Sequence, residues 1–327
     1  MIFKCKNCAG NMVYSPDKDA MYCSHCDSVD CEETTYVSGT TVCVNCGGEI
    51  HVNEYTSASQ CIYCGSYTIF DERVSGEYEP HLILPFKLSK EAVKKRLYEE
   101  FKKRIFAPSS FLSEAKLDSM EGMYVPFWMY DYKANYDYEG KGTKVRIWTV
   151  ASMEYTETSI FSVKRNLDIS FQKIPVDASI AMEDGIMDLM EPYSYEALEK
   201  FQEKYMSGFF GEMYNEDAEK LESRASSKAR NDSEMLLNNT ISGYSVVTPI
   251  RKDLTMNSSQ TNYALLPVWI YTYKYRGETY RFHINGQTGK LIGKAPISTG
   301  KVMSYGGTVA VATLLIGFLV KAILGVL

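Results

Sequence analysis

Motifs of catalysis and nucleotide binding are missing from this sequence of 327 residues. It contains no GxGxxG, HExxH or GxSxG pattern, and only four histidines are available as acid–base groups. The GQTGK segment at residues 286–290 is too short for a P-loop, which needs about four residues between its glycines. We therefore expect no catalytic residues, no enzyme activity and no small-molecule substrate.

Basic residues are scarce in the first 80 positions. Four Lys and Arg side chains stand against twelve Asp and Glu, a net charge of −8, whereas the whole chain carries −6. Each Zn²⁺ bound by four thiolates adds about −2, which brings this stretch to about −12. Since proteins bind nucleic acid mainly through Lys and Arg contacts to phosphates, we expect no nucleic-acid partner for this region.

Cysteine is absent after Cys64, and all nine cysteines lie between Cys5 and Cys64. The first residues, MIFKCKNC, lack a charged segment followed by an apolar run, so we expect no signal peptide. Clustered CxxC pairs without such a leader indicate metal binding in a reducing compartment, and no disulfides.

Four CxxC pairs form two units of the same spacing. In each unit 14 residues separate the two pairs, and the units are offset by 38 positions. Their cysteines are Cys5, Cys8, Cys23 and Cys26, then Cys43, Cys46, Cys61 and Cys64. Two facing turns can hold one tetrahedral ion, and four thiolates leave no open position for a substrate. The sequence therefore predicts two structural Zn²⁺ ions in two zinc ribbons, at residues 1–38 and 39–72.

Two other groups of side chains allow more than one interpretation. Cys31 lies outside the repeated spacing and is a spare ligand, a reactive thiol or a reduced bystander, of which we favour the last. An acidic group either holds Mg²⁺ or belongs to a solvated loop, and we favour the loop. Its members are Glu183, Asp184, Asp188 and Glu191.

A basic amphipathic helix is predicted at residues 89–106. The apolar residues Val93, Leu97, Phe101 and Ile105 recur every four positions, and Ser89 suits the N-cap. Eight Lys and Arg side chains but only three Glu lie between residues 87 and 104. This face is either a solvated surface, which we favour, or a contact for anionic lipid or nucleic acid.

An aromatic motif occurs twice in residues 73–300. Residues 125–132 (VPFWMYDY) and 266–273 (LPVWIYTY) share the pattern aliphatic-Pro-apolar-Trp-apolar-Tyr-x-Tyr. Period-two spacing places Trp128, Tyr130 and Tyr132 on one strand face, and proline at a strand start costs no ladder hydrogen bond. Such a face either stacks on bases or packs in the core, and we favour the core.

We expect residues 73–300 to form an α+β domain. Gly-bearing turns at residues 276–278 and 285–289 predict a meander of short antiparallel strands after the second motif. Helices are predicted at residues 194–205 and 216–237. The predicted fold class is thus α+β, with two small β zinc ribbons, a duplicated Pro-x-Trp strand motif and a C-terminal transmembrane helix.

The C-terminal 20 residues form an apolar run. Residues 308–327 contain one charge, Lys321, and as a helix they span ~30 Å, the thickness of a bilayer's hydrocarbon core. Lys321 lies near the end and can extend to the interface, and the alternative is an interfacial or buried helix. Lysines precede the run, so the positive-inside rule places the N-terminal domains in the cytoplasm. We predict a single-pass protein of the cell membrane, with an anchor at residues 301–327 that contacts lipid through residues 308–327.

Several motifs resemble the bacterial membrane proteins with a transcription-factor-IIB-type zinc ribbon. They are the CxxC pairs, LPFKLS (84–89), Phe106-Ala107-Pro108, YVPFW (124–128), Ser207-Gly208-Phe209, LLPVW (265–269) and YRFHINGQTGK, which ends at Lys290. Some members carry labels from the zinc-binding part of replication-restart helicases, but no helicase motor is present here. Others look like partners of the PspA-type envelope-stress system, which implies a role in holding a stress protein at the membrane.

Two functions compete on this sequence. The first is a membrane-anchored zinc-ribbon adaptor or scaffold that recruits protein partners at the cytoplasmic face of the membrane, in envelope stress if the resemblance holds. The alternative is a nucleic-acid-binding zinc-ribbon protein of replication or transcription. The acidic charge of the ribbons favours the adaptor, and the basic helix at residues 89–106 is the feature that could reverse this preference.

Overall fold

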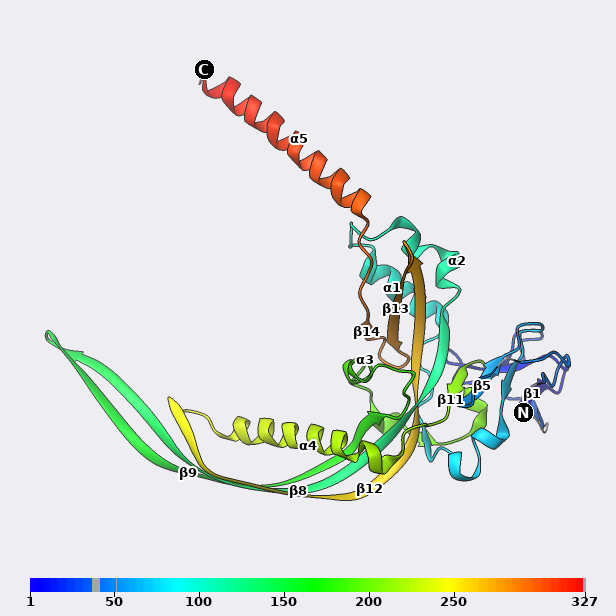
Figure 1. Cartoon of the computed structure of the whole chain (residues 1–327), viewed down its shortest axis with the longest axis horizontal. Coiled ribbons are helices and arrows are strands. Elements are labelled where there is room, and N and C mark those ends of the chain that lie inside the picture. The colour runs from blue at the N-terminus through cyan, green and yellow to red at the C-terminus, as the bar shows by residue number, and fades with distance from the viewer. Residues whose placement is uncertain (37–41, 51, 326–327) are drawn as a thin grey trace.

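Three long strands dominate the fold (Figure 1). The computed structural model describes residues 1–36, 42–50 and 52–325. In it β8 (Glu121–Val150) pairs antiparallel with β12 (Val246–Tyr275) on one side and with β9 (Met153–Asp177) on the other. These strands form a curved arm, and the chain has the mixed α+β fold that the sequence predicts.

The arm belongs to a ten-stranded sheet. The main order is β10–β7–β12–β8–β11–β5–β6, with β9 beside β8 and β13 beside β12. The shorter strands are β5 (Thr56–Gln60), β6 (Tyr67–Ile69), β7 (Leu82–Ile83), β10 (Glu199–Lys200), β11 (Phe210–Glu212), β13 (Glu278–Asn285) and β14 (Leu291–Ile292). The predicted meander of short antiparallel strands after the second motif is confirmed, since β13 pairs antiparallel with β12 and β14 pairs antiparallel with β13. The strand β12 has 30 residues because it pairs along its length with β8, which is distant in sequence.

The two aromatic motifs lie side by side on antiparallel strands. Val125 of β8 faces Leu266 of β12, so the two copies run in opposite directions from this pair. The aromatic side chains are buried except for Trp128, which is partly buried, and Tyr130 and Tyr271 are among the most deeply buried. The prediction that they pack in the core is confirmed, and these rings offer no free face to a base.

Pro126 and Pro267 lie inside their strands, which corrects the prediction that each begins one. Pro126 stands where the neighbour of β8 changes from β11 to β9. Pro267 stands where the neighbour of β12 changes from β7 to β13. A missing N–H is tolerated at these two places because each falls between the ladders of two successive partner strands.

Helix α1 (Lys90–Phe101) begins after the predicted cap Ser89 and buries Val93, Leu97 and Phe101 against the sheet. Its predicted end at residue 106 is wrong, and Ile105 is exposed beyond the helix. The loop that follows instead contacts the base of the last helix, where the Ser298 N–H donates to the Phe106 carbonyl.

Helix α4 (Ala218–Thr240) covers the concave side of the arm, close to the helix predicted at residues 216–237 (Figure 1). Its buried residues Leu221, Ala225 and Ala229 pack on β8 and β9. The helix predicted at residues 194–205 is wrong. That segment forms two 3₁₀ turns and β10, because Glu199 and Lys200 pair with β7.

Short helices connect the remaining strands. They are η1 (Asp71–Arg73), η2 (Gly76–Tyr78), η3 (Ser109–Leu112), α2 (Glu114–Leu117), α3 (Asp184–Leu189), η4 (Tyr195–Ala197) and η5 (Glu203–Met206).

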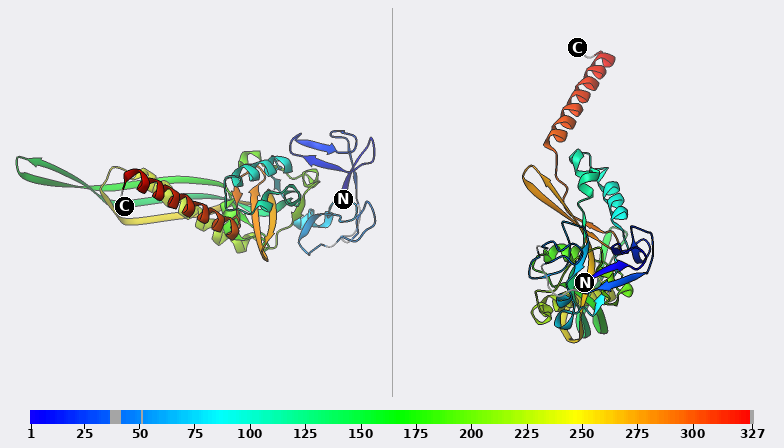
Figure 2. Two further views of the ribbon diagram at one scale, coloured as in Figure 1. Left: turned by 90° about the horizontal axis from the view of Figure 1, so that it is seen from above. Right: turned by 90° about the vertical axis from the view of Figure 1, so that its right-hand side faces the viewer.

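Helix α5 (Thr299–Leu324) projects away from the rest of the molecule (Figures 1 and 2). Within the part of the chain that the structure describes, α5 is the one helix that is long and apolar enough to cross a membrane. Its apolar stretch is not buried against the rest of the protein. It starts nine residues before the predicted span, whose last two residues lie outside the described residues. At its base the ring of Tyr305 packs on Phe106 with centroids 5.5 Å apart, and the Ser298 N–H donates to the Phe106 carbonyl at 2.8 Å.

Candidate metal centres

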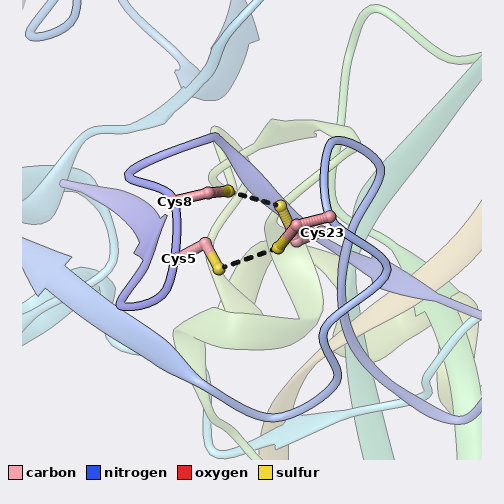
Figure 3. Close-up of side chains that lie close together, drawn as sticks. Cys5, Cys8 and Cys23 are labelled. Carbon is pink, nitrogen blue, oxygen red and sulfur yellow. Dashed lines mark hydrogen bonds between the residues drawn. The ribbon is translucent and has the colours of Figure 1, made fainter.

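Ribbon 1 consists of two two-stranded sheets. The strand β1 (Ile2–Cys5) pairs with β4 (Glu32–Thr35), and β2 (Met12–Ser15) pairs with β3 (Ala20–Cys23). Cys5 and Cys23 end β1 and β3, and Cys8 and Cys26 follow each of them in a tight turn. The four sulfurs lie within 4.8 Å of one another (Figure 3). The shortest separations are 3.5 Å for Cys8–Cys23 and 3.6 Å for Cys5–Cys26.

Ribbon 2 repeats this arrangement. Its four sulfurs, from Cys43, Cys46, Cys61 and Cys64, also lie within 4.8 Å of one another. Cys43–Cys64 are 3.6 Å apart and Cys46–Cys61 3.7 Å, the same pairs as in ribbon 1 after the 38-residue offset. The predicted boundary between the ribbons, at residues 38 and 39, lies outside the described residues. The hairpin β5–β6 of ribbon 2 is part of the ten-stranded sheet through β11.

The sulfur separations suit a tetrahedral metal ion. With metal–sulfur bonds of about 2.3 Å, the edge of a tetrahedron of sulfurs measures about 3.8 Å. The two observed separations in each ribbon are close to this length. All eight predicted cysteines are thus brought into two groups of four that could each bind one metal ion, and no disulfide joins them.

Each CxxC pair lies in a tight turn, here called a knuckle. This turn requires a residue in the left-handed conformation directly after its second cysteine. Gly47 and Gly65 supply it in ribbon 2, with φ of 72° and 71°. Ribbon 1 uses Ala9 and Asp27 at the same places, with φ of 58° and 60°. An alanine in this conformation costs roughly 1–2 kcal/mol, so ribbon 1 stores strain that ribbon 2 avoids.

The thiols of a site do not ionise alike. Burial opposes ionisation of Cys5, but hydrogen bonds led by the backbone amide of Asn7 outweigh it and lower the pKa of the thiol to about 6. For Cys8 the backbone amide of Gly10 favours the thiolate, yet neighbouring thiols and burial outweigh it and raise the pKa to about 12. The pKa of the equivalent Cys46 is also raised to about 12. A metal that binds as a thiolate complex must therefore displace the protons of Cys8 and Cys46.

Cys31 touches the first site from outside its group of four. Its Sγ lies 3.4 Å from that of Cys5 and 3.9 Å from Sδ of Met12. Burial is the main reason that the pKa of the Cys31 thiol is raised. The Cys31 thiol is thus held largely protonated beside the four-cysteine group.

The acidic group predicted as a magnesium site or a solvated loop instead pairs with helix α4. Arg224 lies 2.8 Å from Asp188 and 3.2 Å from Asp184, and Lys228 lies 3.1 Å from Glu191. Three of the four carboxylates, all except Glu183, are thus paired with cations of α4, and the described residues hold no candidate metal cluster beyond the two cysteine groups.

Much of the basic face of α1 is engaged within the protein. Lys94 Nζ lies 2.8 Å from a carboxylate oxygen of Glu91, and Arg96 donates to the Thr288 carbonyl at 2.6 Å. Lys95 on the helix and Lys102, Lys103 and Arg104 after it are exposed.

Comparison with known proteins identifies one relative of nearly the same length. The uncharacterized protein YdjG of Bacillus subtilis (strain 168) is 34% identical over 334 residues, which cover 99% of this chain and 98% of the relative. No family model matches the chain. No solved structure matches it either. The resemblance to transcription-factor-IIB-type zinc-ribbon membrane proteins therefore stays a prediction.

Proposed function

This chain belongs to the family of the Bacillus subtilis protein YdjG, and we propose that it is a membrane-anchored zinc-ribbon adaptor that recruits a protein partner at the cytoplasmic face of the cell membrane. In this proposal two structural Zn²⁺ ions shape the ribbons and α5 anchors the chain in the bilayer. The observation that carries it is an exposed apolar pair on ribbon 2.

The second knuckle of ribbon 2 presents Ile62 and Tyr63 to solvent. Their side chains are 77% and 66% exposed although both lie between Cys61 and Cys64, which hold the backbone at either side. The Tyr63 ring packs over Gly48, where an added Cβ would lie 2.5 Å from its Cδ2. A large aromatic and a large aliphatic side chain on a metal-fixed turn are the type of anchor that protein interfaces use.

The matching knuckle of ribbon 1 lacks this pair. Ser24 and His25 stand between Cys23 and Cys26, and both are exposed polar side chains. The apolar pair is thus not a requirement of the ribbon turn itself. Together with the acidic charge of the first 80 residues, it favours a protein partner with an apolar or basic surface over a nucleic acid.

Basic side chains at the base of α5 support the cytoplasmic orientation. Lys301 Nζ donates to the Ala107 carbonyl at 2.7 Å, which places the loop after α1 beside the start of α5. The exposed Lys102 and Lys103 precede this loop. Basic residues next to a membrane span favour the cytoplasmic side. The resemblance to partners of PspA-type proteins extends the proposal to envelope stress, with a stress protein as the recruited partner.

Metal analysis of the full chain purified in detergent is expected to give two Zn²⁺ per chain. Because the pKa of Cys8 and Cys46 is raised, binding displaces their protons, and metal affinity rises with pH. Calorimetry in buffers of different ionisation enthalpy measures this proton release. The control Cys31→Ser retains both ions, and one ion per chain, none, or iron in place of zinc would contradict this assignment.

A photoreactive phenylalanine analogue in place of Tyr63 is expected to crosslink the full chain to a protein in intact cell membranes. The adduct is lost when Ile62→Asp is added, because a carboxylate in a desolvated pocket opposes docking. The same analogue in place of His25, on the matching knuckle of ribbon 1, is the control and gives no adduct.

The nucleic-acid alternative makes the opposite prediction. Crosslinks from position 63 to DNA or RNA would reject the adaptor. So would tight, salt-sensitive DNA binding by the full chain in detergent, because such binding requires phosphate contacts that the ribbons lack.

A further inference from the structure

The far end of the arm is a hairpin of two strands that the third strand does not reach. Pairing of β12 with β8 ends at Val246 and Thr143, whereas β8 and β9 remain paired to Val150 and Met153. Residues 145–160, here named the arm tip, therefore project as an isolated two-stranded ribbon (Figure 1). Such a ribbon is only marginally stable in water unless something packs against it.

The arm tip exposes large apolar side chains on both of its faces. Ile147 and Ile160 are 59% and 62% exposed, and the alternation of strand residues places both on one face. The other face carries exposed Trp148, Val150, Met153 and Tyr155. Contiguous exposed apolar surface of this kind marks a site of interaction. No element within the described residues covers it.

The side chains of the second face follow a definite order from the turn inward. The pair Val150–Met153 is outermost, and the rings of Trp148 and Tyr155 come next, stacked with centroids 5.7 Å apart. Arg146 lies behind them, with its Cζ 5.4 Å from the centre of the Trp148 ring. Side chains at a membrane–water interface follow the same order from the bilayer outward. Aliphatic side chains lie deepest, aromatic rings lie at the headgroups, and cations extend toward water.

We propose that the arm tip inserts into the headgroup layer of the same bilayer that α5 spans, as a second membrane contact of this chain. A lipid interface surrounds both apolar faces of a hairpin, whereas a protein surface normally covers one. The inference rests on α5 lying in a membrane, and it is independent of the partner of ribbon 2.

The shape of the molecule makes this contact accessible. The 30 residues of β8 span about 100 Å at about 3.3 Å per residue, so the tip can reach membrane far from α5. The arm curves toward the side from which α5 rises, and in the view from above α5 extends over the arm (Figures 1 and 2). Since α5 tethers the arm to the bilayer, a weak affinity of the tip is sufficient for occupancy.

The chemistry of the tip limits the depth of insertion. Its strand edges carry unpaired backbone groups, which hydrocarbon does not tolerate. Glu154 faces Thr149 next to the turn, and Glu157 faces Arg146. These carboxylates keep the tip in the hydrated headgroup region instead of the bilayer interior.

Tryptophan fluorescence of the full chain in phosphatidylcholine–phosphatidylglycerol vesicles tests this proposal. Trp148 is exposed, whereas Trp128 and Trp269 pack among core residues. We expect nitroxides on the lipid headgroup to quench the emission strongly and nitroxides at mid-chain to quench it weakly. Trp148→Phe removes the quenched component and identifies it.

The double variant Val150→Asp with Met153→Asp leaves Trp148 in place and is expected to lose the headgroup quenching and to gain iodide accessibility. Ile250→Asp, at an exposed apolar residue of β12 short of the tip, is the matched control and retains the quenching. All variants should float with the vesicles, because α5 is unchanged. Loss of flotation would instead reject the α5 anchor.

Iodide-accessible, unquenched Trp148 in the floated wild-type chain overturns the proposal. The proposal is also overturned if Trp148 is protected from iodide in lipid-free detergent by contact with a protein. That result would indicate that the tip docks on a protein surface.

Discussion

Replacing Cys8 by serine is expected to destabilise the whole chain, whereas the equivalent change Cys46→Ser leaves the long sheet folded. Both variants lose one metal ion, since each removes one of four ligands. The difference between them arises from how each ribbon joins the rest of the protein.

We expect ribbon 1 to depend on a bound metal. Its strands form only two-stranded sheets, which are marginal without further support. Yet Met12, Tyr14 and Met21 of this ribbon belong to the main hydrophobic core, and Tyr14 packs on Tyr205 with ring centroids 5.0 Å apart. When the metal is lost these side chains lose their positions, and we expect the free energy of unfolding to drop by about 3 kcal/mol or more.

Ribbon 2 is supported by the sheet as well as by its metal. Its hairpin β5–β6 is hydrogen-bonded to β11, and its cysteines pack in a small separate cluster with Ile50 and Phe70. Loss of the ion should therefore disorder the turn at Cys43–Cys46 and leave the β5–β6 hairpin in place. Thermal unfolding followed by circular dichroism, together with metal analysis, measures the difference. Equal destabilisation by Cys8→Ser and Cys46→Ser would contradict this explanation, and Cys31→Ser is the control.

Replacing Arg224 by alanine is expected to cost about 3–5 kcal/mol of stability, the usual effect of leaving a buried charge without its partner. Arg224 of α4 lies 2.8 Å from Asp177, which is fully buried at the end of β9. Burial raises the pKa of Asp177 to about 6, although Arg224 opposes this. Without the guanidinium, burial and the nearby carboxylates of Asp184 and Asp188 raise the pKa of Asp177 unopposed by Arg224.

The loss should depend on pH. In the Arg224→Ala chain the pKa of Asp177 rises above its wild-type value, so folding favours the protonated form. A group with a raised folded-state pKa contributes stability at low pH and loses it as the pH rises through that pKa. The variant should therefore approach wild-type stability near pH 5 and fall furthest below it near pH 8.

Lys220→Ala is the matched control on the same helix. Its ion pair with Glu216 measures 2.7 Å, but the lysine side chain is 67% exposed, so we expect no measurable change. The double variant Arg224→Met with Asp177→Asn should recover much of the loss, because it removes both buried charges together. A pH-independent loss in Arg224→Ala would show that packing of α4, and not the charge of Asp177, is responsible.

The sequence by itself determined the features whose signal is local. The CxxC spacing places four sulfurs together in each ribbon, because two tight turns joined by a short segment bring their thiolates to one point. The apolar run was sufficient to predict α5. The four-residue period predicted α1 as far as Phe101, and it overextended the helix only where the next loop turns toward α5.

Only the tertiary structure decided the features that join distant segments. The length of β12, and of β8 as far as Thr143, comes from pairing between strands more than 100 residues apart, which no local alternation reports. Segment 199–200 became a strand because β7 was available as its partner. Asp177 and Arg224 are 47 residues apart in the sequence but form an ion pair in the fold. The pair affects stability because Asp177 is buried. The arm tip became an exposed apolar surface because α4, whose residues cover one face of the arm closer to the body, does not extend over it, and because β12 ends before it.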